Sequence, residues 1–209
     1  PVNWLLILCP KKFIIEFMTI LIVLKTGLSG LSFSWYLKKH FGVKKFGVGF
    51  FGIFYALSGY MAAYSWNIMW LDCIMLFPLI LLGLEQLVKE KKGTLYCITL
   101  GLSILSNYYI SIMICIFMVI YVIAQMTLNP PKSFGEFMGT GLRFAFYSLL
   151  AGGLAAVVLL PEIYALQVTA SGDFDFPKTF SSYFSIFDMI ARHIGNVGTE
   201  IGLDHWPNI

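Results

Sequence analysis

Long apolar stretches alternate with short polar loops along the chain. A helix needs about 20 mostly apolar residues to cross the ~30 Å hydrocarbon core of a bilayer. Residues 13–36, 46–64 and 71–88 have this length and character. The pattern predicts three membrane-spanning helices in the N-terminal half of the chain.

The next apolar stretch, residues 94–126, is too long for one span. As a single helix it would be about 50 Å long at 1.5 Å per residue. Its middle, residues 106–109, is polar enough to form a turn. We therefore predict two short antiparallel helices, over 94–106 and 109–126.

The C-terminal part contains one further predicted span. Two prolines after residue 129 interrupt the helical pattern, and the apolar residues within 134–138 predict a short interfacial helix. A final span is predicted over 144–160, with small residues that permit close packing. Residues 163–209 are predicted to form an extracytoplasmic loop. The expected fold is an all-α, polytopic transmembrane bundle with about six spans within residues 1–162.

Composition supports this class of protein. Hydrophobic residues make up 58% of the chain and charged residues 12%, whereas a soluble domain averages about 25% charged residues. So few charges cannot cover a water-facing surface, so lipid must cover most of it. The composition therefore excludes a soluble globular protein.

Lysine clusters between the spans predict the orientation. Short cytoplasmic loops of membrane proteins are enriched in Lys and Arg. The clustered lysines are Lys38, Lys39, Lys44, Lys45, Lys89, Lys91 and Lys92. We therefore predict a multi-pass protein of the bacterial cell membrane with these loops in the cytoplasm. The clusters are too short and isolated to indicate nucleic-acid binding.

Three other patterns have plainer explanations than the chemistry they resemble. Gly47, Gly49 and Gly52 match GxGxxG, but they open a membrane helix, where glycine permits close packing, and do not follow a strand. Asp173 and Asp175 resemble a DxD metal site, but a solvated acidic loop is the simpler interpretation. The four cysteines show no CxxC spacing, so metal or redox use is not predicted.

Polar and aromatic residues gather at the span ends opposite the lysine clusters. The candidates for lining a cleft there are Asp72, Asn67, Trp66, Trp70, Asn107, Tyr108 and Glu162. A carboxylate at the mouth of a membrane helix is costly unless it faces water, protein or a ligand. Asp72 is therefore either a functional contact or a helix cap. An interfacial aromatic belt also explains the tryptophans, and turn chemistry alone explains Asn107.

Other charged residues give weaker candidates. Glu16 and Lys25 lie nine residues apart, so they face nearly opposite sides of one helix and cannot pair. Lys25 lies deep in the span and needs another partner. Arg192 and His193 form a candidate phosphate contact, with a structural ion pair as the alternative. His193 and His205 do not have the spacing of a known metal motif, and no metal site is predicted.

Several of these segments resemble the YfhO family of bacterial membrane proteins. The resemblance rests on residues 27–37 with the basic loop after them, 56–60, 66–67, 70–72, 106–109 and 206–209. It is most specific over 56–87. The resemblance implies a GT-C type fold: a many-helix membrane enzyme that transfers a sugar from a polyprenyl-phosphate carrier outside the cell. The implied acceptor is a cell-wall polymer such as lipoteichoic acid.

The resemblance also limits what is expected of this chain. GT-C enzymes place their catalytic carboxylate in the first external loop, which we expect upstream of Pro1. The chain is therefore expected to be a fragment of a longer protein and inactive alone, with its catalytic residue unknown. No cofactor is predicted with certainty, and a divalent cation is an open alternative. The alternative functions are a transporter or lipid flippase and a non-catalytic membrane scaffold.

Overall fold

Regular structure is helical throughout the residues that the computed structural model describes, which are 2–42, 46–131 and 133–168. Residues 1–165 form one compact unit. The elements in chain order are η1 (Val2–Leu8), η2 (Lys11–Phe13), α1 (Ile14–His40), α2 (Gly47–Ala56), α3 (Gly59–Tyr64), α4 (Ile68–Glu90), α5 (Thr94–Ser106), α6 (Tyr108–Leu128), α7 (Phe134–Leu154) and α8 (Ala156–Val168). The predicted all-α class is confirmed.

Four helical segments are long and apolar enough to cross a membrane: Lys11–His40, Gly47–Tyr64, Ile68–Glu90 and Tyr108–Leu128. A fifth is present if α7 and α8, which are bent by 81° at their junction, form one broken span. The predicted number of six spans is therefore too high for the described residues. One predicted span that is missing from this set is α5, whose 13 residues extend only about 20 Å. The other is the span predicted over 144–160, which falls in the bent pair of α7 and α8.

Large apolar side chains lie on the outer surface of the helices as well as between them. On α2, Phe50, Phe51 and Phe54 are 61%, 59% and 60% exposed. Soluble monomers rarely expose large contiguous apolar patches, whereas lipid-facing helices do so along their length. The surface is therefore that of a polytopic membrane protein.

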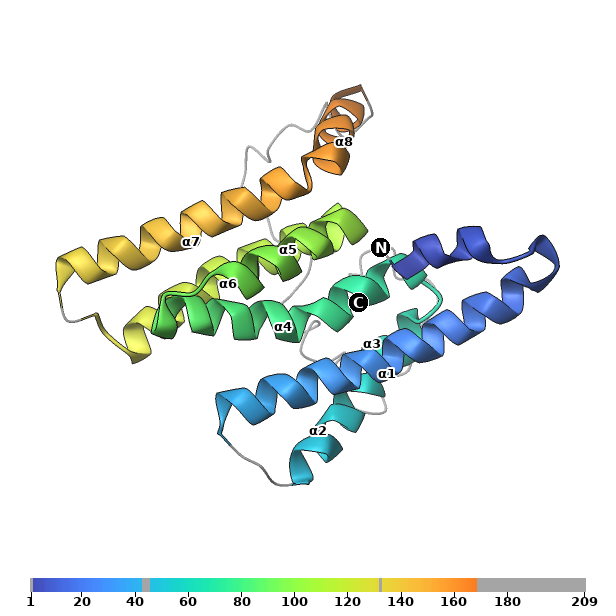
Figure 1. Cartoon of the computed structure of the whole chain (residues 1–209), viewed down its shortest axis with the longest axis horizontal. Coiled ribbons are helices and arrows are strands. Elements are labelled where there is room, and N and C mark those ends of the chain that lie inside the picture. Colours follow the sequence, from blue (N-terminus) through green and yellow to red (C-terminus); the bar gives the residue numbers. More distant parts are fainter. Residues whose placement is uncertain (1, 43–45, 132, 169–209) are drawn as a thin grey trace, which may run out of the picture. The chain divides into compact units, whose positions relative to one another are not determined.

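Helices α1 and α4 pack side by side and run in the same direction (Figure 1). Lys25 of α1 contacts Asp72 near the start of α4, and Tyr36 near the end of α1 contacts Glu85 near the end of α4. The two helices are parallel, because these contacts keep the same order along both. The intervening α2 and α3 therefore return the chain to the side from which α1 came.

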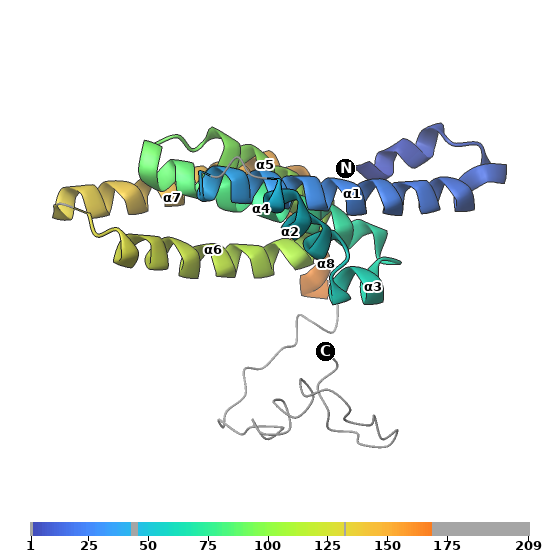
Figure 2. The same cartoon turned by 90° about the horizontal axis from the view of Figure 1, so that it is seen from below.

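Helices α5 and α6 pack against α4. Cys73 of α4 contacts Asn107 between α5 and α6, and Tyr121 in the second half of α6 contacts Glu85. Helix α6 therefore runs parallel to α4 and α5 runs opposite to both; Figure 2 shows α6 beside the layer that holds α4 and α5. We call the end with Cys73 and Asn107 the Asn107 end, and the end with Glu85 and His40 the lysine end.

The last two helices differ from the expected span over 144–160. Helix α7 is continuous over Phe134–Leu154, so the expected interfacial helix is its first turns. The chain bends at Ala155, and α8 continues through Pro161 to Val168. The predicted span ended at residue 160, directly before Pro161. The break falls earlier because two adjacent glycines precede it, and glycine is about 1 kcal/mol less favourable than alanine within a helix.

Glycines allow two close helix crossings. A Cβ on Gly83 of α4 would lie 2.6 Å from the Cα of Tyr96 of α5, and a Cβ on Gly52 of α2 would lie 2.6 Å from the carbonyl oxygen of Gly30 of α1. Real side chains do not tolerate such contacts with backbone atoms. Gly52 belongs to the GxGxxG match, so its close approach supports the packing interpretation of that segment.

Pro78 lies buried inside α4. Proline has no N–H, so the carbonyl of Ile74, four residues earlier, loses its partner within the helix. The Tyr55 hydroxyl of α2 donates to this carbonyl at 2.9 Å. A neighbouring helix thus satisfies the freed group, as is usual for proline in membrane helices.

Replacing Tyr55 by phenylalanine is expected to lower the free energy of unfolding by about 1–2 kcal/mol, because the Ile74 carbonyl is left without a partner. Pro78→Ala restores a backbone donor for that carbonyl, so Tyr55→Phe should cost much less in that background. Unfolding of the wild type, both single variants and the double variant in detergent micelles measures the coupling. Equal costs in the two backgrounds would contradict this assignment.

Candidate functional site

A buried ion pair joins α1 to the first turns of α4. The Lys25 ammonium lies 2.9 Å from Asp72 Oδ1, and the two side chains are 0% and 1% exposed. Lys25 also donates to Asn3 Oδ1 at 2.5 Å and to the Ile68 carbonyl at 2.9 Å. The three donors of the ammonium group therefore all have acceptors. The expectation that Lys25 requires a protein partner is confirmed, and Asp72 is that partner.

This geometry excludes one of the two interpretations of Asp72, that of a helix cap. Helix α4 begins at Ile68 and its N-cap is Asn67, so Asp72 lies one turn inside the helix and is not a cap. Its carboxylate faces Lys25 within the protein. In the described residues it is therefore held in an ion pair, with its negative charge balanced.

A second polar group lies next to this pair, at the Asn107 end. The Cys73 thiol contacts the Ser103 carbonyl at 3.5 Å, the Asn107 carbonyl at 3.7 Å and the Ser111 hydroxyl at 3.8 Å. The Ser103 and Ser111 hydroxyls are 2.8 Å apart. Hydrogen bonds of this kind hold membrane helices together. They bring α4, α5 and α6 together one residue from Asp72, so Asp72 and Asn107 lie at the same end.

Asn107 shapes the turn itself. Its backbone is extended (φ −163°, ψ 112°), and its side-chain oxygen accepts from the Ile110 N–H at 2.9 Å. Asn107 is thus the N-cap of α6, as turn chemistry predicted. Asn67, the N-cap of α4, makes no such side-chain bond.

Asn107→Ala is therefore expected to lower the free energy of unfolding by about 1 kcal/mol, the usual loss of an N-cap bond. Asn107→Asp keeps an acceptor and should retain most of the stability. Asn67→Ala is the matched control and should cost only a few tenths of a kcal/mol. Thermal unfolding in detergent compares the three. A larger loss for Asn67→Ala than for Asn107→Ala would contradict the capping assignment.

Aromatic side chains continue from this turn across the start of α4. Ring centroids are 6.5 Å apart between Trp70 and Tyr109, 6.2 Å between Tyr64 and Trp70, and 5.2 Å between Tyr60 and Tyr64. Trp66 is 67% exposed. We call this row of four packed rings, Tyr60, Tyr64, Trp70 and Tyr109, the aromatic row. Of the predicted tryptophans, Trp70 belongs to it, whereas the Trp66 indole donates to the Ala63 carbonyl at 3.0 Å.

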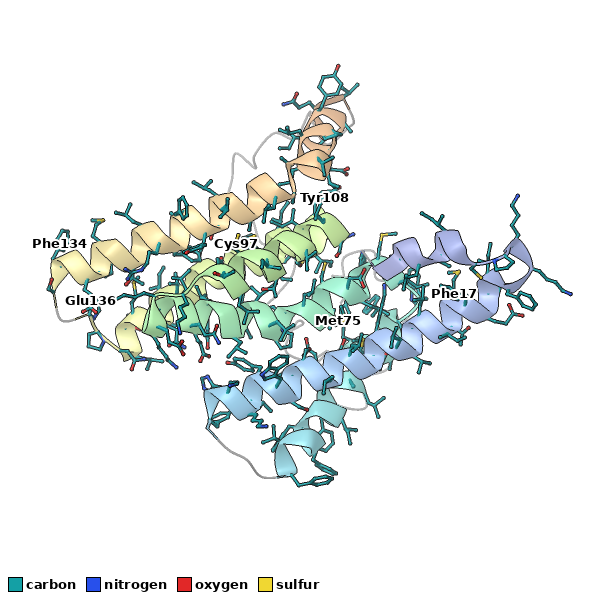
Figure 3. All side chains as sticks on the ribbon, viewed as in Figure 1. Phe17, Met75, Cys97, Tyr108, Phe134 and Glu136 are labelled. Atoms are coloured by element: carbon teal, nitrogen blue, oxygen red, sulfur yellow. The ribbon has the colours of Figure 1, made fainter. Side chains whose placement is uncertain are left out.

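Tyr108 and Glu162 also meet at the Asn107 end. The Tyr108 hydroxyl lies close to the Glu162 carboxylate, so the start of α6 approaches α8. Figure 3 labels Tyr108 at this end, with Phe134 and Glu136 at the other end of α7. Five of the seven predicted residues, Asp72, Trp70, Asn107, Tyr108 and Glu162, thus take part in contacts that converge on this end.

The remaining candidates are not placed. Arg192, His193, His205, Asp173 and Asp175 lie outside the described residues, so their proposed roles stay predictions. Within 2–42, 46–131 and 133–168, no group of three or more His, Cys, Asp or Glu side chains could hold a metal ion.

The lysine end contains a cluster that the sequence reasoning missed. Glu85 is 5% exposed, and its Oε1 accepts from the Tyr121 hydroxyl at 2.8 Å and the Tyr36 hydroxyl at 3.1 Å. His40 Nδ1 lies 2.6 Å from the same oxygen, and the Lys89 ammonium lies 3.2 Å from Oε2. We call these five residues the Glu85 network; it ties α1, α4 and α6 together.

One signal could have found this network. Glu85 falls inside the predicted span 71–88, between Leu84 and Gln86, and an ionisable residue within a span is by default functional or paired. Tyr36 and His40 are four residues apart and so share a face of α1. Their partners lie 45 or more residues away, a distance at which helical spacing gives no information.

Comparison with known proteins gives the family. The family model described as bacterial membrane protein YfhO matches residues 1–209. The curated proteins and the solved structures give no significant match. The match covers the whole chain, and the described helices are those of a polytopic membrane protein. The chain therefore belongs to the YfhO family of bacterial membrane proteins.

Proposed function

We propose that this chain forms part of a membrane glycosyltransferase that takes a sugar from a polyprenyl-phosphate donor and passes it to an extracytoplasmic acceptor such as lipoteichoic acid. The observation that carries the proposal is the gathering of polar and aromatic side chains at the Asn107 end, opposite the lysine end. Under the positive-inside rule the lysine end is cytoplasmic, which makes the Asn107 end the outer one.

The aromatic row supports a sugar-binding role for this end. Tyrosine and tryptophan combine an apolar ring face with a polar tip, which suits the C–H faces and hydroxyls of a sugar ring. Tyr109 is 51% exposed, so part of the row is open to a ligand. Its position beside the first turns of two membrane helices suits a donor whose lipid tail stays in the bilayer.

The Lys25–Asp72 pair has a positioning role in this proposal. A general base must accept a proton from the acceptor hydroxyl, and Asp72 is buried with its charge balanced by Lys25. Asp72 therefore fixes the start of α4, which bears Trp70, and does not act as the base. The base is expected outside the described residues. Cationic contacts to the departing phosphate, with Arg192 and His193 as candidates, are expected there as well.

A transfer assay tests the proposal. The complete polypeptide in which this chain occurs is reconstituted with a radiolabelled sugar on polyprenyl phosphate and with lipoteichoic acid. Labelled polymer is expected to form, and Trp70→Ala should lower kcat/KM roughly tenfold, the order of one lost stacking contact. Trp35→Ala is the matched control, because Trp35 is an exposed tryptophan (54%) far along α1. No donor consumption by the wild type, or equal losses in both variants, would contradict the proposal.

One observation favours a second candidate, a transporter or lipid flippase. Transporters keep charged groups within the bilayer, and Lys25 and Asp72 are a buried charged pair between two membrane helices. In a flippase, Lys25→Met combined with Asp72→Leu should abolish movement of labelled polyprenyl phosphate across vesicles. In the transferase, the same double variant should retain most sugar transfer, because the pair only positions α4.

A further inference from the structure

Two lysine clusters that are far apart in the sequence meet at the lysine end. His40 at the end of α1 lies 2.6 Å from Glu85, and Lys89 lies 3.2 Å from the same carboxylate. The residues next to them in sequence therefore come to one end of the helices: Lys38 and Lys39 from α1, and Lys91 and Lys92 after α4. The Glu85 network thus assembles one cationic surface from two loops.

Most of this positive charge is not balanced by carboxylates. Glu85 is buried and already accepts from four side chains, and the exposed Glu90 pairs with Lys92. In the described part of the chain, Lys38, Lys39 and Lys91 make no ion pair. Three exposed ammonium groups are therefore free to bind an anion.

The backbone at Lys91 is a second observation. Lys91 ends α4 in the left-handed conformation (φ 61°), a position that glycine occupies without strain and that most side chains avoid. Strain of this kind at an exposed residue points to a role for the side chain. Glycine would form the same turn, so the property that lysine adds at this position is its positive charge.

Exposed aromatic residues place this surface at the edge of the bilayer. Trp35, Phe41 and Phe46 are 54%, 66% and 99% exposed, and they flank Lys38 and Lys39 in sequence. Aromatic side chains collect at the boundary between hydrocarbon and headgroups. The lysine ammonium groups therefore lie at headgroup depth, within reach of lipid phosphates.

We propose that the lysine end binds the phosphate headgroups of anionic phospholipids, with Lys38, Lys39 and Lys91 as the contacts and the Glu85 network holding the two loops together. Clustered lysines next to membrane helices attract anionic lipid. This binding is independent of sugar transfer.

Electron spin resonance with spin-labelled lipids tests the proposal on the purified chain in phosphatidylcholine vesicles. The association of spin-labelled phosphatidylglycerol, relative to spin-labelled phosphatidylcholine, is measured for each variant. The double variant Lys38→Gln/Lys39→Gln is expected to lower this ratio by about two- to fivefold. The matched control, Lys11→Gln/Lys12→Gln, removes the same charge from η2, which precedes α1 and lies at the opposite end of it from the lysine end, and should leave the ratio nearly unchanged.

Lys91→Gly separates lipid binding from folding. It relieves the left-handed strain, so the protein should unfold at the same or a higher temperature while phosphatidylglycerol association falls. The proposal is overturned if Lys38→Gln/Lys39→Gln leaves the ratio unchanged. It is equally overturned if the Lys11→Gln/Lys12→Gln control lowers the ratio as much, since the effect would then be one of net charge.

Discussion

Replacing Asp72 by leucine is expected to lower the free energy of unfolding by about 3–5 kcal/mol, the usual result of removing one partner of a buried ion pair. The cost arises because the Lys25 ammonium, which is 0% exposed, would remain buried without a counter-charge. Lys25→Met should cost a similar amount for the converse reason. Denaturant unfolding in detergent micelles gives the values.

The double variant Lys25→Met/Asp72→Leu distinguishes charge from packing. Replacing both members of a buried pair by apolar residues of similar size is often nearly neutral, so the double variant should be more stable than either single one. Lys92→Met is the matched control: Lys92 and Glu90 form a pair at 3.1 Å with 75% and 53% exposure, and such pairs contribute about 0–1 kcal/mol. If the double variant lost as much free energy of unfolding as the two single variants together, the account of Lys25 and Asp72 as a buried ion pair would be contradicted.

Glu85→Leu is expected to lower the free energy of unfolding by about 3 kcal/mol or more. The Tyr36 and Tyr121 hydroxyls would lose their common acceptor. They lie 3.3 Å apart, so one could still donate to the other, and a buried polar group left unsatisfied costs about 1–3 kcal/mol. Glu90→Leu, which removes an exposed carboxylate from the same helix, is the matched control and should change stability by less than about 1 kcal/mol. A similar loss in both variants would show that the Glu85 network does not tie the helices together.

The sequence predicted that a particular residue requires a partner better than it predicted which residue that partner is. A lysine in the middle of an apolar helix must have a counter-charge, and this holds for Lys25. Its partner, Asp72, lies on a helix that begins 43 residues later, at Ile68, whose carbonyl Lys25 also contacts. Helical periodicity describes one helix at a time, so it could not choose between Asp72 and another carboxylate.

Local backbone signals succeeded where one residue decides the conformation. The break in 94–126 lies at Asn107, because an asparagine side chain can cap the following helix. The prediction over 144–160 failed because the bend depends on competition between the glycines before Ala155 and Pro161. Glycine and proline both interrupt helices, and the sequence alone does not show at which of the two positions the helix breaks. The predicted small-residue face holds in part: Ala151 and Ala155 are fully buried, whereas a Cβ on Gly152 or Gly153 would meet no neighbour within 4 Å.

Of the two polar clusters, one was predicted from the sequence and the other was not. The Asn107 end was predicted as one group because the turns that contain its residues share one side of the predicted topology. The Glu85 network was missed because its residues lie beside the lysine clusters, where a carboxylate four residues before Lys89 is explained by a surface pair along one helix. Only the packing of α1 and α6 on α4 shows that Glu85 is buried.

The sidedness of the Asn107 end is the central claim, and cysteine accessibility tests it most directly. The four native cysteines are replaced by serine or alanine, and single cysteines are introduced by Trp66→Cys, Tyr109→Cys, Lys39→Cys and Lys91→Cys. In intact cells, a membrane-impermeant maleimide is predicted to label positions 66 and 109 and to label 39 and 91 only after permeabilisation. Labelling of positions 66 and 109 from opposite sides of the membrane would contradict the account.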